Sequence, residues 1–296
     1  MKHAALALAL IALAAAPQEP VSIYAFPPNE KQPYEVIGEM RISLAGSHKD
    51  FIEKGNEVPL KVEYRALFEN VVVVPGDKEK PTALHRKVKK LTVTGEYKGE
   101  ALKVDYDPGR SAEKQFIAQG QGDLVEFFRL WCATPAEFKC SALGKVQWAD
   151  ERLDRLMIKA GMMYWQVQHD TVTWDTTERI AVPLLHHKIS VVFHNKFVKT
   201  ETEGSRKLMI IEAKPEIAAA EAPGADEPKE IESIEPTFKA GGSAKAQIDL
   251  TQGRLHSLRL NLKIEFSGHA PVSDGAKGTL RGEVNFTESQ VYKEKP

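Results

Sequence analysis

The sequence predicts an α+β protein: a large, curved antiparallel β-sheet, half-barrel-like in shape, with a helical insertion packed on one face. Two observations lead to this prediction. Apolar and polar residues alternate over long stretches, which is typical of half-buried strands, and a segment with helical spacing interrupts them at residues 123–161. Nearly every neighbouring pair of predicted strands can form a hairpin, so we expect the sheet to be antiparallel.

The clearest strand signal lies near the carboxyl end of the chain, at residues 255–266. Every even position from 258 onward is apolar, and the odd positions between them are polar. The even positions are Leu258, Leu260, Leu262, Ile264 and Phe266. A strand places all of them on one face, whereas a helix would scatter them around its circumference. Their burial is worth roughly 7–15 kcal/mol at ~1.5–3 kcal/mol each, an upper bound because the unfolded chain already hides part of that surface.

The same alternation predicts further strands before and after this one. Gly38 interrupts the first of them, which indicates a bulge or a point of close contact. Turns are predicted at Pro75-Gly76-Asp77 and Asp107-Pro108-Gly109. The predicted strands lie at residues 34–44, 58–74, 88–94, 101–106, 164–174, 180–185, 188–198, 206–213, 244–250 and 280–286.

Three short helices are predicted in the middle of the chain. Asp123 can cap the first, in which apolar residues recur at helical spacing, namely Leu124, Phe127, Phe128 and Trp131. Thr134-Pro135-Ala136-Glu137 is a capping-box sequence that predicts the start of a second helix. Asp150 can cap a third, which should end at Gly161. We expect these helices to cover the apolar face of the sheet, hence the α+β class.

The two ends of the sequence and one internal segment differ from the predicted sheet. Residues 1–16 have a positive start, a short apolar run and small residues at the end, which is typical of a secretory signal peptide. A membrane span is the alternative, but it needs ~20 apolar residues. Residues 17–33 form a proline-rich lead-in, residues 34–296 a single β-rich domain, and residues 215–236 an acidic mobile loop. We therefore expect a secreted or periplasmic protein whose mature chain has no transmembrane segment.

Cys132 and Cys140 lie close together in a chain that is predicted to enter an oxidising compartment, where thiols tend to pair. We predict a disulfide, whose short loop would contribute about 2–3 kcal/mol. The alternative is two free, buried thiols. Two ligands do not make a zinc site, so no metal is predicted here.

Several motifs together resemble a known family. These are the turn Tyr106-Asp107-Pro108-Gly109-Arg110, the helical middle, the segment Gly161-Met162-Met163-Tyr164-Trp165, and Ile248-Asp249-Leu250-Thr251-Gln252-Gly253-Arg254-Leu255. In this order they resemble a family of secreted, uncharacterised bacterial β-rich proteins known only as a domain of unknown function. The resemblance covers most of the mature chain, although the family has Gly-Asp-x-Trp where this chain has Gly161-Met162-Met163-Tyr164-Trp165. It implies an extracytoplasmic location and a β-rich fold, and it implies no catalytic residues.

No motif is strong enough to name a reaction, so we interpret the chain as non-enzymatic, without catalytic residues, cofactor or metal. The alternative is a serine- or histidine-dependent hydrolase of envelope substrates. Ser111 and Lys114 match the Ser-x-x-Lys of penicillin-recognising enzymes, but the companion motifs are absent. The candidate histidines are His186, His187 and His194. The first and last lie about 26 Å apart on a strand at ~3.3 Å per residue, so they cannot share one metal.

Our leading hypothesis is that the apolar concave side of the sheet binds an apolar, lipid-like small molecule or docks a cell-envelope partner. In architecture such a protein would resemble lipid-carrying half-barrels, which is an analogy of fold alone. The tryptophans could line such a pocket or could simply pack in the core. The predicted ligand-binding residues are Tyr64, Phe68, Trp165, Leu258, Leu260, Leu262, Ile264 and Phe266.

A third interpretation is a protein–protein interaction module. Its contacts would be the basic residues 85–90 or the acidic residues 216–235. The alternative for residues 85–90 is a solvated edge strand protected by lysines. The chain carries 40 basic and 41 acidic side chains, a formal charge of −1, so bulk charge predicts no nucleic-acid partner.

Overall fold

The computed structural model describes residues 23–46, 56–77, 79–97, 99–149, 164–168, 171–182, 187–221, 237–271 and 277–294. Within these ranges the chain forms a 13-stranded antiparallel sheet and one α-helix, α1, at Gly122–Ala133. The strands are β1 Lys31–Gly46, β2 Asn56–Val74, β3 Thr82–Tyr97, β4 Glu100–Tyr106, β5 Phe116–Gln119, β6 Ala136–Cys140, β7 Val146–Ala149, β8 Thr173–Val182, β9 His187–Glu203, β10 Arg206–Glu221, β11 Thr237–Asp249, β12 Arg254–Pro271 and β13 Lys277–Tyr292. The fold is therefore essentially all-β, and the predicted α+β class is wrong.

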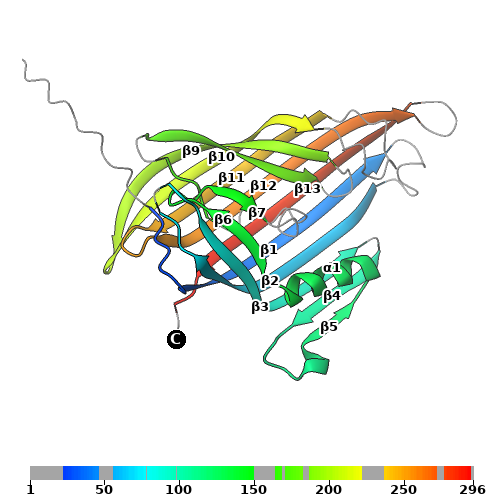
Figure 1. The fold of residues 1–296 in the computed structure, drawn as a ribbon. Helices are drawn as coiled ribbons and strands as arrows, with labels where there is room; N and C mark the ends of the chain where they lie inside the picture. The colour runs from blue at the N-terminus through cyan, green and yellow to red at the C-terminus, as the bar shows by residue number, and fades with distance from the viewer. Residues whose placement is uncertain are drawn as a thin grey trace, which may run out of the picture.

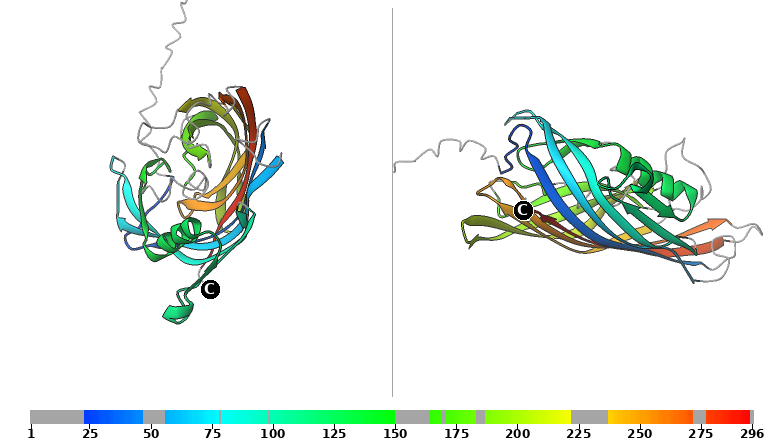
Figure 2. Two further views of the ribbon diagram at one scale, coloured as in Figure 1. Left: turned by 90° about the vertical axis from the view of Figure 1, so that its right-hand side faces the viewer. Right: turned by 90° about the horizontal axis from the view of Figure 1, so that it is seen from below.

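The strands follow the order β5-β4-β3-β2-β1-β13-β12-β11-β10-β9-β8, with β6 and β7 attached to β3. Most neighbours are consecutive hairpins, and the pairing of β1 with β13 joins the two ends of the chain. The sheet is not closed, because β5 and β8 lie at its edges. Seen end-on it curves around an interior that holds shorter elements (Figures 1 and 2). The predicted large antiparallel sheet is confirmed.

Side chains alternate between an inner and an outer face of this sheet. On β12 the five even positions predicted to share a face are all buried, at 0–4% exposure. Arg259 and Asn261, which lie between them, are exposed. The alternation that predicts the strand therefore also predicts its buried face.

The middle of the chain contains less helix than predicted. Helix α1 forms where expected and buries Phe128 and Trp131. The second predicted helix is instead strand β6, in which Ala136, Phe138 and Cys140 are buried. Strand β6 hydrogen-bonds to residues 82–86 of β3, a stretch of edge that β4 leaves unpaired, and this long-range pairing overrides the local capping signal. The third predicted helix lies outside the described residues.

Several boundaries and one local feature differ from the prediction. Strand β1 begins at Lys31, and the preceding Ile23 and Tyr24 are buried, so part of the proline-rich lead-in belongs to the core. Strand β10 continues to Glu221, so the first residues of the predicted acidic loop are strand. The register shift of β1 lies at Ile42, which leaves Gly38 as a point of close contact.

The predicted disulfide is wrong, because Cys132 and Cys140 are both buried and free. Cys132 lies near the end of α1, and Cys140 lies at the far end of β6. An extended strand advances ~3.3 Å per residue, so β6 carries the second thiol away from the first. A helix, with its shorter rise, would have kept the two thiols closer.

We expect both thiols to be titratable only after unfolding. Burial raises the pKa of Cys132 to about 12 and also raises that of Cys140, so neither forms a thiolate at neutral pH. A colorimetric thiol reagent should detect no free thiol in the native protein and two in denaturant without reductant. A reductant should leave the unfolding midpoint unchanged. One thiol or none after denaturation would contradict the free state of this pair.

Candidate functional site

The inner face is built from residues that lie side by side on four neighbouring strands, β12, β13, β1 and β2. The pairing registers place them in three rows: Leu260, Glu288, Gly38 and Tyr64; Leu262, Phe286, Met40 and Val62; Ile264, Val284, Ile42 and Leu60. The eight predicted ligand-binding residues are all buried, at 7% exposure or less. Six of them, the five of β12 and Tyr64, lie in or beside these rows. One acid, Glu288, stands among the apolar side chains.

Glu288 is held by a tyrosine from a distant part of the sequence. The Tyr64 hydroxyl donates a hydrogen bond of 2.6 Å to Glu288 Oε2. The tyrosine ring reaches across Gly38, because a Cβ at that glycine would lie 2.3 Å from the ring. The glycine that interrupts the first predicted strand therefore provides space for this ring.

Burial controls the protonation of Glu288. Desolvation raises its pKa from 4.5 to about 8, although the hydrogen bond from Tyr64 and the charge of Arg86 act in the opposite direction. At neutral pH the carboxyl is therefore mostly protonated. Its second oxygen, Oε1, has no hydrogen-bond partner among the described residues.

Arg86 is the most unusual side chain of the inner face. It lies on β3, is 1% exposed, and its guanidinium stacks over Phe68 at 5.2 Å and Phe138 at 5.9 Å from the ring centroids. Its Nε donates a hydrogen bond of 2.8 Å to Asn70 Oδ1. Its Nη1 and Nη2 have no hydrogen-bond partner in the described part of the chain. Burial lowers its pKa to about 10, so the group stays charged at neutral pH.

A chain of buried polar groups fixes the position of Arg86. Asn70 Nδ2 donates to the Tyr164 hydroxyl over 3.4 Å, and that hydroxyl donates to Gln32 Oε1. Gln32 Nε2 in turn donates to Glu30 Oε2 over 2.8 Å. The network holds the guanidinium through Nε only, so its two Nη atoms remain free to bind another group.

Tyr34 is a second buried group without a partner. It is fully buried, its ring packs edge-on against Tyr292 at 5.6 Å, and its hydroxyl makes no hydrogen bond to any described residue. The charge of Arg86 acts on both Tyr34 and Glu288, lowering the pKa of each against the larger effect of burial. Tyr34 and Glu288 therefore each lie within electrostatic range of Arg86.

Aromatic side chains close the interior near Arg86. The ring of Tyr164 packs against Tyr24 at 5.0 Å, Phe26 at 5.3 Å and Phe138 at 6.2 Å. The next residue, Trp165, donates its indole N–H to Asn195 Oδ1 over 2.9 Å. These contacts join two segments outside the sheet, residues 23–30 and 164–168, to its inner face.

Sequence reasoning placed Arg86 in an exposed basic segment, and this was wrong. On the side away from β2, strand β3 pairs with β6 at residues 82–86 and with β4 at residues 91–97, so Arg86 does not lie on an unpaired edge. Arg86 lies on the same face of β3 as its buried neighbours Leu84 and Val88, and this alternation was the signal in the sequence that could have indicated its burial. The outward residues of the segment have acidic neighbours, since His85 contacts Glu137 and Lys89 lies near Glu69. These contacts offset part of the positive charge of the segment.

Ser111 and Lys114 lie in a short, exposed turn. The 3₁₀ helix Ala112–Lys114 is one turn long, and both side chains are exposed. No hydrogen bond of the described chain joins the two side chains.

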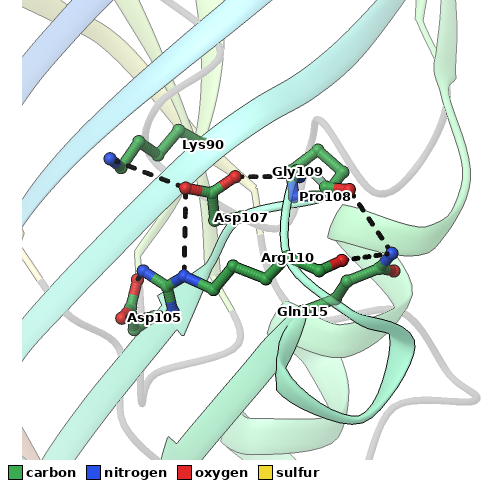
Figure 3. A network of polar contacts seen from close by, with 7 residues as sticks. All are labelled: Lys90, Asp105, Asp107, Pro108, Gly109, Arg110 and Gln115. Carbon is green, nitrogen blue, oxygen red and sulfur yellow. Dashed lines mark hydrogen bonds and ion pairs between the residues drawn. The ribbon is translucent and has the colours of Figure 1, made fainter.

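A polar network fixes the start of this loop (Figure 3). Arg110 binds Asp105 with both Nη atoms at 2.8 and 3.2 Å, and Asp107 Oδ1 accepts a hydrogen bond from the Gly109 amide over 2.9 Å. Lys90 Nζ lies 3.7 Å from the other oxygen of Asp107. The turn that was part of the family resemblance therefore serves as a structural joint between β3, β4 and the loop.

Of the three histidines predicted as candidates, only the side chain of His194 is described. His186 lies outside the described ranges. His194 is exposed on β9 with Nδ1 2.8 Å from Asp175 and Nε2 3.0 Å from Glu216, and these two hydrogen bonds raise its pKa. Both ring nitrogens are thus occupied by carboxylates. In the part of the chain that is described, no three potential metal ligands come together.

The outer face carries open hollows. One of about 740 Å³ extends over β8 to β13, and its lining includes His194, Lys214, Lys245 and Arg259. Two others, of about 600 and 530 Å³, are also lined mainly by outward-facing side chains of the sheet. Ionic groups of both signs line these hollows, and they indicate no particular ligand.

The fold and the inner face define a class: an all-β protein built from one open antiparallel sheet with an apolar inner side and a charged outer side. Among the described residues no helix has the length and apolar character to cross a bilayer. A comparison with models of protein families found no match, and a comparison with curated proteins found none either.

Solved structures show only distant similarity. One is an outer membrane channel from Pseudomonas putida F1, with 7% identity, 93% of this chain and 99% of that chain covered, and a TM-score of 0.20. Another is OccK8 (OprE) of Pseudomonas aeruginosa, with 6% identity, 91% and 100% covered, and a TM-score of 0.19. Similarities of this size establish neither a shared fold nor a shared function.

Proposed function

We propose that this chain is an extracytoplasmic, non-enzymatic protein that binds an apolar, lipid-like ligand on the inner face of its sheet. The observation that carries the proposal is the continuity of the apolar inner face, in which three cross-strand rows draw on the same four strands. Sites for small molecules are concave and mostly apolar, with a few polar groups that fix orientation. The signal-like residues 1–16 support the extracytoplasmic location, and we also propose membership of the secreted bacterial family that the motifs resemble.

The buried state of the inner face sets a condition on binding. The predicted ligand-binding residues are at most 7% exposed, so a ligand reaches them only after covering groups have moved. Binding that requires such a change is slower than the typical association of preformed surfaces. We therefore expect slow association with a long-chain ligand.

The test is tryptophan quenching by a long-chain alcohol that is brominated in the middle of its chain. Such a neutral ligand should quench Trp165, which is buried beside Phe193 on the inner face. The variant Trp165→Phe should lose much of the quenching. Trp148 on β7 is 50% exposed, so Trp148→Phe is the matched control and should keep it. No saturable quenching, or quenching that only Trp148→Phe removes, would contradict the proposal.

A further inference from the structure

We propose that the ligand of the inner face is an amphiphile with an acidic oxygen headgroup, a carboxylate or a phosphate, bound by the Arg86 guanidinium and the Tyr34 hydroxyl. This inference rests on the proposed function and specifies its ligand class. It begins from two groups that are almost fully buried and lack partners within the described chain, Arg86 Nη1 and Nη2 and the Tyr34 hydroxyl.

The charge balance of the interior indicates an anion. A buried guanidinium without a counterion is unfavourable, since a buried charge needs both a partner and hydrogen bonds. The nearby acid, Glu288, makes its hydrogen bond with Tyr64 and not with Arg86. The groups that contact the guanidinium directly are neutral, namely Asn70 and the rings of Phe68 and Phe138, and the acid of the network, Glu30, is reached only through Asn70, Tyr164 and Gln32. An anionic headgroup would supply the missing negative charge.

The hydrogen-bonding capacity indicates an oxygen acid. The two Nη atoms of an arginine form a planar fork that matches two oxygens of a carboxylate or phosphate. The Tyr34 hydroxyl adds a third donor, and a headgroup that only accepts hydrogen bonds satisfies all three. A neutral alcohol or amide headgroup would leave part of the fork unpaired.

The apolar rows indicate the direction in which the hydrocarbon chain of the ligand would lie. Arg86 is paired with Asn70, and Asn70 with Gln32, so the guanidinium lies at one end of the inner face. From Tyr34 to Ile42 the inner face of β1 extends about 26 Å at ~3.3 Å per residue. A headgroup at Arg86 would therefore direct a hydrocarbon chain along the rows that contain Leu260 and Leu262.

The test compares ligands that share a chain and differ in headgroup: oleate, oleyl alcohol and oleoyl lysophosphatidic acid, with inorganic phosphate and acetate as chainless anions. Titration calorimetry should show at least one acid amphiphile binding about tenfold or more tightly than the alcohol. Arg86→Met and Tyr34→Phe should reduce this preference to about threefold or less, because they weaken the binding of the acid amphiphile more than that of the alcohol. Arg259→Met, on the exposed outer face of β12, is the matched control and should keep the preference.

The outcomes separate the two proposals. If the acid and the alcohol bind equally tightly and the variants do not change this, the proposal of an acidic headgroup is wrong. The proposed apolar site then still stands, and water alone satisfies the hydrogen bonds of Arg86 and Tyr34. If no chain-bearing ligand binds, both proposals fail. If phosphate or acetate alone binds as tightly as the amphiphile, the site is an anion site and the amphiphile is wrong. The affinities of oleate and lysophosphatidic acid, compared with each other, show whether the site prefers a carboxylate or a phosphate headgroup.

The stability of two tyrosine variants tests the headgroup site without any ligand. The Tyr34 hydroxyl has no partner in the described chain, so Tyr34→Phe should leave the ligand-free unfolding midpoint unchanged or raise it. The Tyr64 hydroxyl is bonded to Glu288, so the matched variant Tyr64→Phe should lower the midpoint. A midpoint lowered as much by Tyr34→Phe would show that its hydroxyl has a structural role, and this would overturn its assignment to the ligand.

Discussion

The variant Glu288→Gln should gain stability relative to wild type as the pH rises. The difference in the free energy of unfolding between variant and wild type should be about 5 kcal/mol larger at pH 9 than at pH 4. Burial raises the pKa of Glu288 to about 8 from its ordinary value of 4.5. Below pH 4.5 the carboxyl is protonated in both the folded and the unfolded chain. Between pH 4.5 and 8 the unfolded chain releases a proton that the folded chain keeps, so wild-type stability falls as pH rises. The difference of about 3.5 pH units, at 1.36 kcal/mol each, gives the stated magnitude.

Urea unfolding at several pH values from 4 to 9 measures this effect. This pH range stays below the pKa of Arg86, which is about 10. The glutamine side chain cannot ionise, but its amide oxygen can still accept the hydrogen bond from the Tyr64 hydroxyl. Glu283→Gln is the matched control on the same strand. Lys263 lowers the pKa of Glu283 from its ordinary value of 4.5, so the stability contributed by this carboxylate is lost only below that value, and the difference between wild type and control should stay nearly constant from about pH 5 to pH 9. Parallel stability curves for wild type and Glu288→Gln would show that this carboxyl is not the buried acid.

Gly38→Ala should destabilise the protein by about 2–4 kcal/mol. A Cβ at this glycine would lie 2.3 Å from the Tyr64 ring and hydroxyl, so the ring must move from its buried position. Overpacking of a core costs about 1–3 kcal/mol, and a displaced ring also loses its hydrogen bond to Glu288. Urea unfolding measures the loss.

Two comparisons make this prediction specific. Gly241→Ala is the matched control on β11, where a Cβ would meet nothing within 4 Å, and it should be neutral or slightly stabilising. In a Tyr64→Leu background Gly38→Ala should cost less, with a coupling of about 1–3 kcal/mol. Equal costs in both backgrounds would show that the glycine is needed for a reason other than the tyrosine ring.

The sequence predicted the apolar residues of the candidate site better than its polar residues. Leu258 to Phe266 follow a local period of two, so their shared buried face could be read directly. Arg86 follows the same parity, but its charge and its basic neighbours favoured an exposed position. The bond between Tyr64 and Glu288 joins residues 224 positions apart, and no local pattern in a single sequence reports such a pair.

Where local signals compete, tertiary contacts decided between them. The segment from Thr134 to Cys140 carries both a capping box and an alternation of buried positions. The unpaired stretch of β3 selected the strand, because it offered backbone hydrogen bonds that the helix could not use. That choice also separated Cys132 from Cys140 and removed the predicted disulfide.

The sequence by itself determined which residues form long strands and which side of each strand is apolar, because both follow from the fixed period of extended backbone. Only the tertiary structure decided that the strands join into one open sheet, that Arg86 and Tyr34 are buried without partners among the described residues, and that Glu288 stays protonated near neutral pH. These properties depend on contacts between distant strands and on the exclusion of water, and neither is encoded in neighbouring residues.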